Sequence, residues 1–351
     1  MPRCSSQRPL GASFPRRGLL IGAGALALAG CGRGNTMTAS RTPVLKVKRL
    51  DRAVAAIAER AKPGILGFGL MNLESGQQWT LNGDRPFPMQ SVFKMLLGAA
   101  ALSEVDAGRL SLAENILIGA AQLSPPHSPI ADAWPERTIY TADELLVAAV
   151  SDSDNTAADV LMKRIGGPGA VTAWLQAKGV KELRVDRYER QLQPEAHGMA
   201  SFRADWKSAA FAQAMATVPP EARARAQAAY LRDPRDTATP NGMLKFLSKL
   251  DAGEIVSPAS TLRLTSIMAR SPRGPERLRA GFPRGVTFAH KIGTAGTDLG
   301  VTAAYNDVGV LTLADRRSYA VAAFLSASPA SEATRANLLS DLGRAVMAAV
   351  G

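Results

Sequence analysis

The sequence predicts an α+β fold in which helices back one antiparallel sheet and a separate lobe is entirely helical. Three observations lead to this prediction. Runs with strand character stand near both ends of the chain, the long middle has helical periodicity, and a helical pattern closes each end of the predicted domain. We therefore expect the two ends of the chain to complete a single sheet.

The amino-terminal part of this domain reads as a helix followed by a hairpin. Apolar residues recur at helical spacing over Leu45–Ala61 and stop before Pro63. Ile65–Leu73 and Gln77–Leu81 have strand character, and the residues between them, Glu74-Ser75-Gly76, are typical of a turn.

The middle of the chain, from Ser91 to about Leu262, is rich in Ala and Leu and is interrupted by Gly and Pro. Its clearest predicted helices are Phe93–Leu110, Thr141–Val150, Asn155–Ile165 and Ala170–Ala177.

After Gly285 the pattern becomes strand-like again. The predicted strands are Val286–Ile292, Val301–Leu313 and Tyr319–Ser326, with a turn at Asp315-Arg316-Arg317. An amphipathic helix over Ser331–Val350 ends the domain.

The first 30 residues are expected to be an export signal outside the fold. Arg16-Arg17 precedes an apolar run over 18–30 that is too short to span a bilayer, which favours a twin-arginine signal, with a Sec signal as the alternative. Leu28-Ala29-Gly30-Cys31 resembles a bacterial lipobox, in which Cys31 is lipidated. Residues 31–44 would be a tether. The domain 45–351 would then be held as a lipoprotein on the periplasmic face of a membrane.

The composition limits the classes of function. Hydrophobic residues make up 46% of the chain, enough for a large core, and the formal charge is +12. Lys/Arg blocks with interleaved aromatics are missing, so we expect a basic surface and no nucleic-acid partner. The two cysteines, Cys4 and Cys31, predict no disulfide in the mature domain. The three histidines lack ligand spacing, so we expect no metal and no cofactor.

The first candidate site is Ser91-Val92-Phe93-Lys94. On a helix, residues three apart share a face, so the Lys94 amine would reach the Ser91 hydroxyl. A serine hydroxyl needs a base to become a good nucleophile. Taken alone, the pattern fits equally well a capping serine and a solvated lysine.

The second candidate is Ser153-Asp154-Asn155, at the start of a predicted helix. A hydroxyl here would relay a proton to a leaving nitrogen, and an amide would hold a substrate amide. The alternative is a helix-capping cluster, because Ser, Asp and Asn are the residues that cap helices.

The third candidate is Lys291-Ile292-Gly293-Thr294, in a predicted strand. Lys291 would hold a substrate carboxylate, and Gly293 would let a ligand approach the backbone closely. The alternative is an ordinary edge strand with a charged residue facing water.

Taken together, the three motifs resemble a known family. S-x-x-K, S-D-N and K-x-G in this order are the signature of class A β-lactamases and penicillin-binding proteins. Phe87-Pro88-Met89, Asn155-Thr156-Ala157-Ala158 and Asp233-Pro234-Arg235-Asp236-Thr237 also look like class A sequence. The resemblance covers roughly residues 46–350. It implies the β-lactamase/DD-peptidase-like fold, a serine hydrolase without cofactor, and β-lactam antibiotics as substrates of a monomeric enzyme.

The resemblance also implies a role for each candidate residue. Ser91 would attack the β-lactam carbonyl, its proton passing to Lys94 or through a water to Glu189, and Ser153 would protonate the leaving nitrogen. Backbone N–H groups of Ser91 and Thr294 would form the oxyanion hole. The remaining residues would bind substrate: Asn155, Lys291, Gly293, Thr294, Gln193 and His127.

A fourth element separates the two families. Arg187-Tyr188-Glu189 resembles the start of the class A Ω-loop, whose glutamate activates the water that hydrolyses the acyl-enzyme. Penicillin-binding proteins lack this glutamate. Arg187 and Asp236 would form the salt bridge that closes the loop. Glu195 is the alternative base if the alignment of this segment with the class A Ω-loop is shifted.

Several positions depart from the family pattern. Ile292 replaces a hydroxyl residue, Gln193 replaces the asparagine that orients the deacylating water, and His127 stands where an aromatic residue guards the cleft. The Ω-loop carries an insertion over about 194–232 with two predicted helices, Ala200–Ala216 and Pro220–Leu231. The insertion would form a lid over the site, a surface that binds a partner, or an extension of the loop without a role of its own. These departures leave two alternatives to a β-lactamase: a DD-peptidase or penicillin-binding protein, and a weakly active lipoprotein that binds the cell wall.

Overall fold

The computed structural model describes residues 44–351, so the expected signal, Cys31 and nearly all of the tether lie outside the described residues. The described residues belong to one compact unit. None of their helices is long and apolar enough to cross a membrane.

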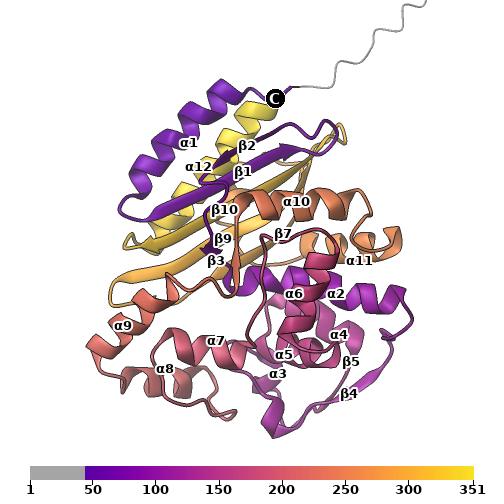
Figure 1. Cartoon of the computed structure of the whole chain (residues 1–351), viewed down its shortest axis with the longest axis vertical. Helices are drawn as coiled ribbons and strands as arrows, with labels where there is room; N and C mark the ends of the chain where they lie inside the picture. Colours follow the sequence, from indigo (N-terminus) through magenta and orange to yellow (C-terminus); the bar gives the residue numbers. More distant parts are fainter. Residues whose placement is uncertain (1–43) are drawn as a thin grey trace, which may run out of the picture. The chain divides into compact units, whose positions relative to one another are not determined.

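One antiparallel sheet joins the two ends of this unit (Figure 1). Its strand order is β2-β1-β10-β9-β7, and β8 pairs with β9. The pairing of β1 with β10 runs from Ile65 opposite Ser326 to Asn72 opposite Tyr319, which confirms that the chain ends complete one sheet. The strands are β1 (Ile65–Asn72), β2 (Gln78–Leu81), β7 (Thr287–Thr294), β8 (Thr297–Asp298), β9 (Val301–Thr312) and β10 (Ser318–Ser328).

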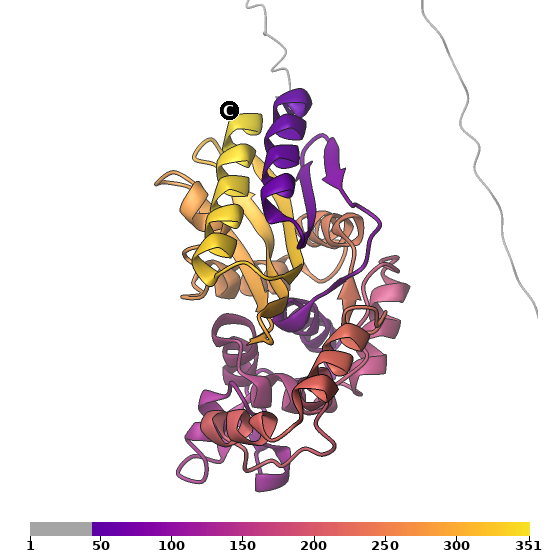
Figure 2. The ribbon, with the colours of Figure 1, turned by 90° about the vertical axis from the view of Figure 1, so that its left-hand side faces the viewer.

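Both faces of the sheet are covered, and this explains why its central strands are apolar almost throughout. Helices α1 (Val47–Ala61) and α12 (Glu332–Val350) lie side by side over one face (Figure 2). Along β10, Tyr319, Val321, Ala323 and Leu325 pack toward these helices. The alternate residues Ala320, Ala322 and Phe324 pack into the cluster of the helical lobe. Because successive side chains of a strand point to opposite faces of the sheet, β10 contributes to the apolar cores on both faces.

The helical lobe is built around α2 (Phe93–Asp106), whose residues from Phe93 to Leu102 are all buried. A helix that is buried on every side has no polar stripe, which is why this segment is apolar all round. It contacts the helices α5 (Asn155–Arg164), α6 (Pro168–Ala177) and α11 (Pro258–Ala269). Helix α4 (Ala142–Val147) and the short α3 (Pro129–Asp132) contact α5, and α10 (Pro240–Asp251) packs against β1 and β10.

The structure also contains short elements that the sequence did not predict. A 3₁₀ turn, Gln90–Val92, leads into α2, and others occur at Ala120–Gln122 and Leu278–Gly281. The predicted helix Thr141–Val150 changes at Ala148 into a π-helical turn, Ala148–Asp152. Such turns are frequent at functional sites because they redirect the chain. The two small sheets pair β3 (Phe87–Pro88) with β6 (Thr237–Ala238), and β4 (Asn115–Leu117) with β5 (Ile139–Thr141).

The predicted insertion forms two helices that follow α7 (Glu189–Ala196). They are α8 (Ser208–Ala216) and α9 (Pro220–Tyr230), and α9 lies nearer the sheet than α8 (Figure 1). The prediction of a helix from Ala200 was wrong, because 200–207 is irregular and turns at Arg203, whose carbonyl accepts from the Trp206 N–H.

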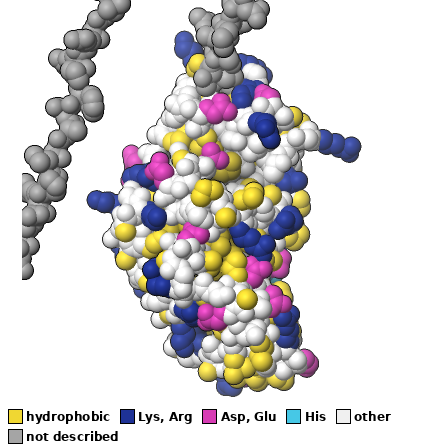
Figure 3. Space-filling view, turned by 90° about the vertical axis from the view of Figure 1, so that its right-hand side faces the viewer, with side chains coloured by type: hydrophobic (Ala, Val, Ile, Leu, Met, Phe, Trp, Pro, Cys, Tyr) yellow, Lys and Arg dark blue, Asp and Glu magenta, His cyan; other side chains and the backbone are white. Residues whose placement is uncertain are grey.

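Charged side chains are dispersed on the face shown in Figure 3, where Lys and Arg are scattered among Asp and Glu. No continuous basic stripe is visible on that face.

Candidate active site

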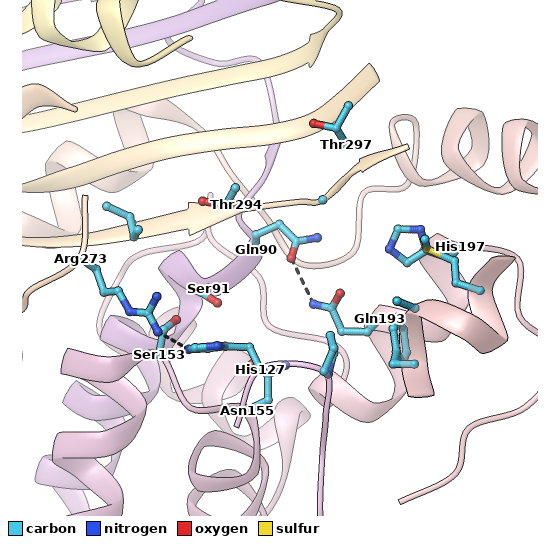
Figure 4. A pocket seen from close by; sticks show the side chains of 16 residues that line it. Gln90, Ser91, His127, Ser153, Asn155, Gln193, His197, Arg273, Thr294 and Thr297 are labelled. Carbon is cyan, nitrogen blue, oxygen red and sulfur yellow. Dashed lines mark hydrogen bonds between the residues drawn. The ribbon is translucent and has the colours of Figure 1, made fainter. Parts of the chain in front are cut away.

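A cavity of about 350 Å³ lies between β7, the helical lobe and the α7–α8 segment (Figure 4). Six of the residues expected at the site line it: Ser91, His127, Ser153, Asn155, Gln193 and Thr294. Lys94, Glu189 and Lys291 are buried and contact these residues. The three motifs and the fourth element therefore meet at one place.

Ser91 stands in the 3₁₀ turn that leads into α2, and Lys94 follows in the first turn of that helix. Lys94 Nζ donates to Ser91 Oγ over 3.1 Å. Gln90, directly before the serine, has a φ of 46°. A non-glycine residue in the left-handed region is strained, and such strain is common where a side chain must be held for function.

Lys94 is fully buried and connects the other groups of the site. Besides Ser91 Oγ, its ammonium donates to the Ser153 carbonyl at 2.8 Å and to Asn155 Oδ1 at 2.5 Å. Its Nζ also lies 2.9 Å from Glu189 Oε1. An ammonium has three protons, and all three are used by the first three acceptors. The contact with Glu189 is thus one of charge, and the solvated lysine considered from the sequence is excluded.

The helix-capping interpretation of Ser153-Asp154-Asn155 is confirmed for Asp154 alone. The Asp154 side chain caps α5 by accepting from the Ala157 N–H at 2.8 Å, and it accepts from the Ile130 N–H at 2.8 Å. Ser153 and Asn155 face the cavity instead. Ser153 has a φ of 66°, a left-handed conformation at the end of the π-helical turn.

Lys291 reaches the site from β7 and is only 2% exposed. Its Nζ donates to Ser153 Oγ over 3.0 Å. Burial, followed by the nearby Lys94 charge, holds the Lys291 pKa well below its usual value. Ser153 therefore has an amine that gives up protons easily at hydrogen-bond distance.

Gly293 lies against the backbone that precedes Ser91. A Cβ at this position would lie 2.2 Å from the Met89 carbonyl oxygen. The glycine therefore lets β7 approach this backbone closely.

The residues beside Gly293 form the wall of the cavity. Thr294 Oγ1 accepts from Arg277 Nη2 at 2.6 Å, and the buried Arg277 guanidinium lies 3.7 Å from the centre of the Tyr305 ring. Ile292 packs on Gly274, where a Cβ would lie 2.6 Å from Ile292 Cγ2.

Glu189 is the first residue of α7 and is completely buried. Its Oε2 accepts from Gln193 Nε2 at 2.7 Å. Asp159 on α5 holds the start of α7, because its carboxylate accepts from the backbone N–H groups of Glu189 at 2.7 Å and Arg190 at 3.1 Å. Burial, together with the Glu189 charge, raises the pKa of Asp159 to about 7.

The loop that carries Glu189 is closed at its base by Arg187 and Asp236, whose Nε and Oδ2 atoms lie 2.6 Å apart. Asp236 also accepts from the backbone N–H of Asp186 at 2.7 Å. Glu195, the alternative base, lies outside the cavity, is about half exposed and pairs with Arg187 at 2.9 Å.

Sequence reasoning missed several residues that line the cavity. Arg273 lines it and contacts His127 Nε2 at 2.5 Å and the Asp152 carbonyl at 3.1 Å. Burial, followed by the charge of Arg273, lowers the pKa of His127 relative to its usual value, although the Asp152 carbonyl opposes this. Phe211 and Met215 of α8 form the far wall. The one signal in the sequence for such a wall is the helical spacing of apolar residues in the insertion, which includes Phe211.

Among residues 44–351, no group of three or more His, Cys, Asp or Glu side chains is arranged to hold a metal ion.

Comparisons with known proteins identify the family of this chain. Residues 49–350 match the family model described as the beta-lactamase enzyme family. Beta-lactamase VEB-1 of Pseudomonas aeruginosa is 29% identical over 81% of this chain and 85% of its own. Extended-spectrum beta-lactamase PER-1 of the same organism is 30% identical over 88% of this chain and 87% of its own.

Solved structures show the same similarity. A beta-lactamase from Chitinophaga pinensis has a TM-score of 0.72 and 32% identity, covering 86% of this chain and 99% of that one. An ancestral class A beta-lactamase of Gram-negative bacteria has a TM-score of 0.70 and 31% identity, covering 86% and 99%.

Proposed function

The chain belongs to the class A β-lactamase family, and we propose that it hydrolyses β-lactams through an acyl-enzyme on Ser91. The observation that carries the assignment of residues is the position of Lys94. This one buried cation donates to Ser91 Oγ and Asn155 Oδ1 and lies 2.9 Å from Glu189 Oε1. It therefore links the nucleophile, a substrate-binding amide and the candidate base.

Acylation forms the bond from Ser91 Oγ to the lactam carbonyl carbon and breaks the lactam C–N bond. The Ser91 proton passes through a water to Glu189, or to Lys94 after Lys94 has given a proton to Glu189. Ser153 protonates the leaving nitrogen and takes a proton back from Lys291, which already donates to Ser153 Oγ. The backbone N–H groups of Ser91 and Thr294 stabilise the oxyanion, and losing one such donor costs about 10²–10³ in rate.

The substrate lies along the cavity with its two ends in different surroundings. Its carboxylate binds near Lys291 and Thr294, where Arg277 holds the threonine hydroxyl in place. Its acyl side chain extends past Asn155 toward Phe211 and Met215 of α8. Because this far wall is apolar, substrates with apolar acyl groups are favoured.

Deacylation uses the free oxygen of Glu189. Within the described part of the chain, Oε1 has no hydrogen-bond donor, although it is buried beside the Lys94 charge. Its lone pair is therefore available to accept a proton from a water. Glu189 takes that proton while the water oxygen attacks the ester carbon. The bond from that carbon to Ser91 Oγ then breaks, and Ser91 Oγ takes the proton back from Glu189 through Lys94, which restores the free serine and the carboxylate.

The test compares wild-type protein with its Glu189→Gln variant on a chromogenic cephalosporin, with intact mass measured during turnover. The wild type should turn over. The variant should remain as a Ser91 adduct with deacylation slowed by about 10²–10⁴, the usual contribution of a general base. Ser91→Ala is the control, which should form no adduct.

Two other results would contradict the assignment. A wild type that acylates and stays acylated would be a penicillin-binding protein. A wild type that never acylates would be a lipoprotein that binds the cell wall without catalysis.

We also propose that the protein is exported and anchored as a monomeric lipoprotein on the periplasmic face. The support is the sequence alone: Arg16-Arg17, the apolar run after it and the lipobox that ends at Cys31. Peptide mass analysis of the membrane fraction should find a lipid on an amino-terminal Cys31. A soluble mature protein that begins at another residue would contradict the anchor.

A further inference from the structure

Four side chains form a hydrogen-bonded chain from the insertion to the candidate base (Figure 4 shows its central bond). Gln193 Nε2 donates to Glu189 Oε2 at 2.7 Å and to Gln90 Oε1 at 3.2 Å. Gln90 Nε2 in turn donates to the hydroxyl of Tyr230 at 2.7 Å. Tyr230 is the last residue of α9, so the insertion reaches the base through two amides.

The direction of every bond in this chain follows from the charge on Glu189. An ionised carboxylate only accepts, so Gln193 must turn its NH₂ group toward Glu189. That same NH₂ group faces Gln90, so Gln90 must present its carbonyl oxygen. The Gln90 NH₂ group then points to Tyr230, whose oxygen accepts. Reversing any amide would place two donors or two acceptors against each other.

The chain is buried and its far end is held firmly. Gln90 is 3% exposed and Tyr230 is 5% exposed. The Tyr230 ring packs with Leu192, Ala196 and Ala303 in a small apolar cluster. Farther along α9, Arg223 pairs with the buried Asp298 of β8 at 2.6 Å.

A glutamine needs such support more than a shorter amide would. Gln193 has one more rotatable bond than asparagine, so holding its amide in one place costs more side-chain entropy. Gln90 provides one partner for that amide, and Gln90 is itself fixed by Tyr230 and by its left-handed backbone. The insertion thereby compensates for the substitution at position 193.

We propose that Tyr230 is a positioning residue for deacylation, acting through Gln90 and Gln193 on the Glu189 carboxylate. The inference rests on the proposed function, in which Glu189 activates the deacylating water. The ion pair with Lys94 and the three donations of Lys94 do not involve Tyr230. Acylation also uses Lys94, whose contacts are kept, whereas Glu189 is the only base in deacylation. Loss of the Tyr230 hydroxyl should therefore slow deacylation far more than acylation.

The test is Tyr230→Phe in the full chain, which removes the acceptor and keeps the ring. Deacylation should slow roughly tenfold, since Gln90 Nε2 would be buried without a partner and would turn away. Acyl-enzyme should accumulate, kcat and KM should fall together, and kcat/KM should stay within about twofold. Tyr319→Phe, in a buried tyrosine of β10 away from the site, is the matched control and should keep both constants.

A second measurement separates positioning from stability. In a Gln193→Leu background the chain is already broken, so adding Tyr230→Phe should slow deacylation no further. Unchanged deacylation in the single variant, a fall of kcat/KM equal to that of kcat, or full additivity in the double variant would overturn the proposal.

Failure of the proposed function would be seen in the wild type, whereas failure of the present proposal would be seen only in the Tyr230→Phe variant. A wild type that does not acylate or does not deacylate overturns the function, and the role of Tyr230 with it. A wild type that turns over while Tyr230→Phe behaves like Tyr319→Phe overturns only the role of Tyr230.

Discussion

Two regions that face each other across the cavity are held together by different forces. The first, here called the floor, consists of Ser91, Lys94, Ser153, Asn155 and Lys291. The second, the roof, is the segment 187–236 with helices α7, α8 and α9. The floor side chains come from elements embedded in the two large apolar clusters, and α2 is buried from Phe93 to Leu102.

The roof has much less apolar support. Its own buried cluster contains only Leu192, Ala196, Tyr230 and Ala303. Tyr188 and Ala204 add partly buried contacts with the cluster of the helical lobe. Most of the other attachments are polar and include ion pairs at Asp236 and Asp298 and the amide chain that ends at Glu189.

Because packing holds the floor and polar contacts hold most of the roof, the two half-reactions depend on parts of the protein that are stabilised in different ways. Acylation takes place mainly on floor groups held by packing, which resists local opening, and Glu189 only receives a proton from them. Deacylation depends on Glu189 as its base, and Glu189 is held by a charged and hydrogen-bonded segment, which opens more easily. Changes in the roof should therefore slow deacylation more than acylation.

The largest effect is expected at the base of the roof. Asp236→Asn would leave the buried Arg187 guanidinium without its main counter-charge, and breaking a buried ion pair costs about 3–5 kcal/mol. Hydrogen exchange should rise over 187–236 while β10 stays protected, and deacylation should slow more than acylation. Asp205→Asn, in an exposed pair with Arg203 in the same segment, is the control and should leave the unfolding free energy and the exchange of the segment nearly unchanged. Equal loss of protection in β10 would show that roof and floor open together.

A smaller effect, dependent on pH, is expected where floor and roof join. Asp159 on α5 holds the first turn of α7, and its pKa of about 7 lies above that of an unfolded aspartate, about 3.9. Between these values the folded protein keeps a proton that the unfolded chain loses. The stabilisation is therefore complete below about pH 4 and is lost as the pH rises to about 7.

This dependence is measured as the unfolding free energy of wild type minus that of Asp159→Asn between about pH 4 and 8. The difference should fall by a few kcal/mol, because one pKa unit corresponds to about 1.4 kcal/mol. The histidines titrate in both proteins and cancel. If the difference in unfolding free energy does not change with pH, Asp159 is ionised throughout this range. The contact of α5 with the first turn of α7 then has no pH dependence of its own.

The smallest effect concerns the apolar part of the roof that faces substrate. Met215→Glu should raise KM for benzylpenicillin about tenfold, since it places a charge beside an apolar acyl group. The KM for 6-aminopenicillanic acid, which lacks the acyl side chain, should change little. Gln213→Glu adds the same charge on an exposed position of α8 and should leave both values unchanged. Equal changes for the two substrates would show that α8 does not contact the acyl group.

Much of the fold could be predicted from the sequence because its signals are local. The spacing of apolar residues indicated α1, α12 and the long strands, and turn residues placed the bends between them. The predictions were wrong where tertiary contacts override periodicity. The helix predicted to reach Val150 continues from Ala148 as a π-helical turn that ends at the left-handed Ser153, and the segment from Ala200 is irregular before α8 begins.

The site shows the same division. The sequence by itself determined which residue types are present and in what order, and so identified the candidate nucleophile, lysines and base. Only the tertiary structure decided that Gly293 admits the backbone at Met89, that Arg273 contacts His127 and that Tyr230 meets Gln90. The physical reason is that these contacts join positions far apart in the chain. Their strength depends on distance and burial, and neither leaves a periodic trace in the sequence around either partner.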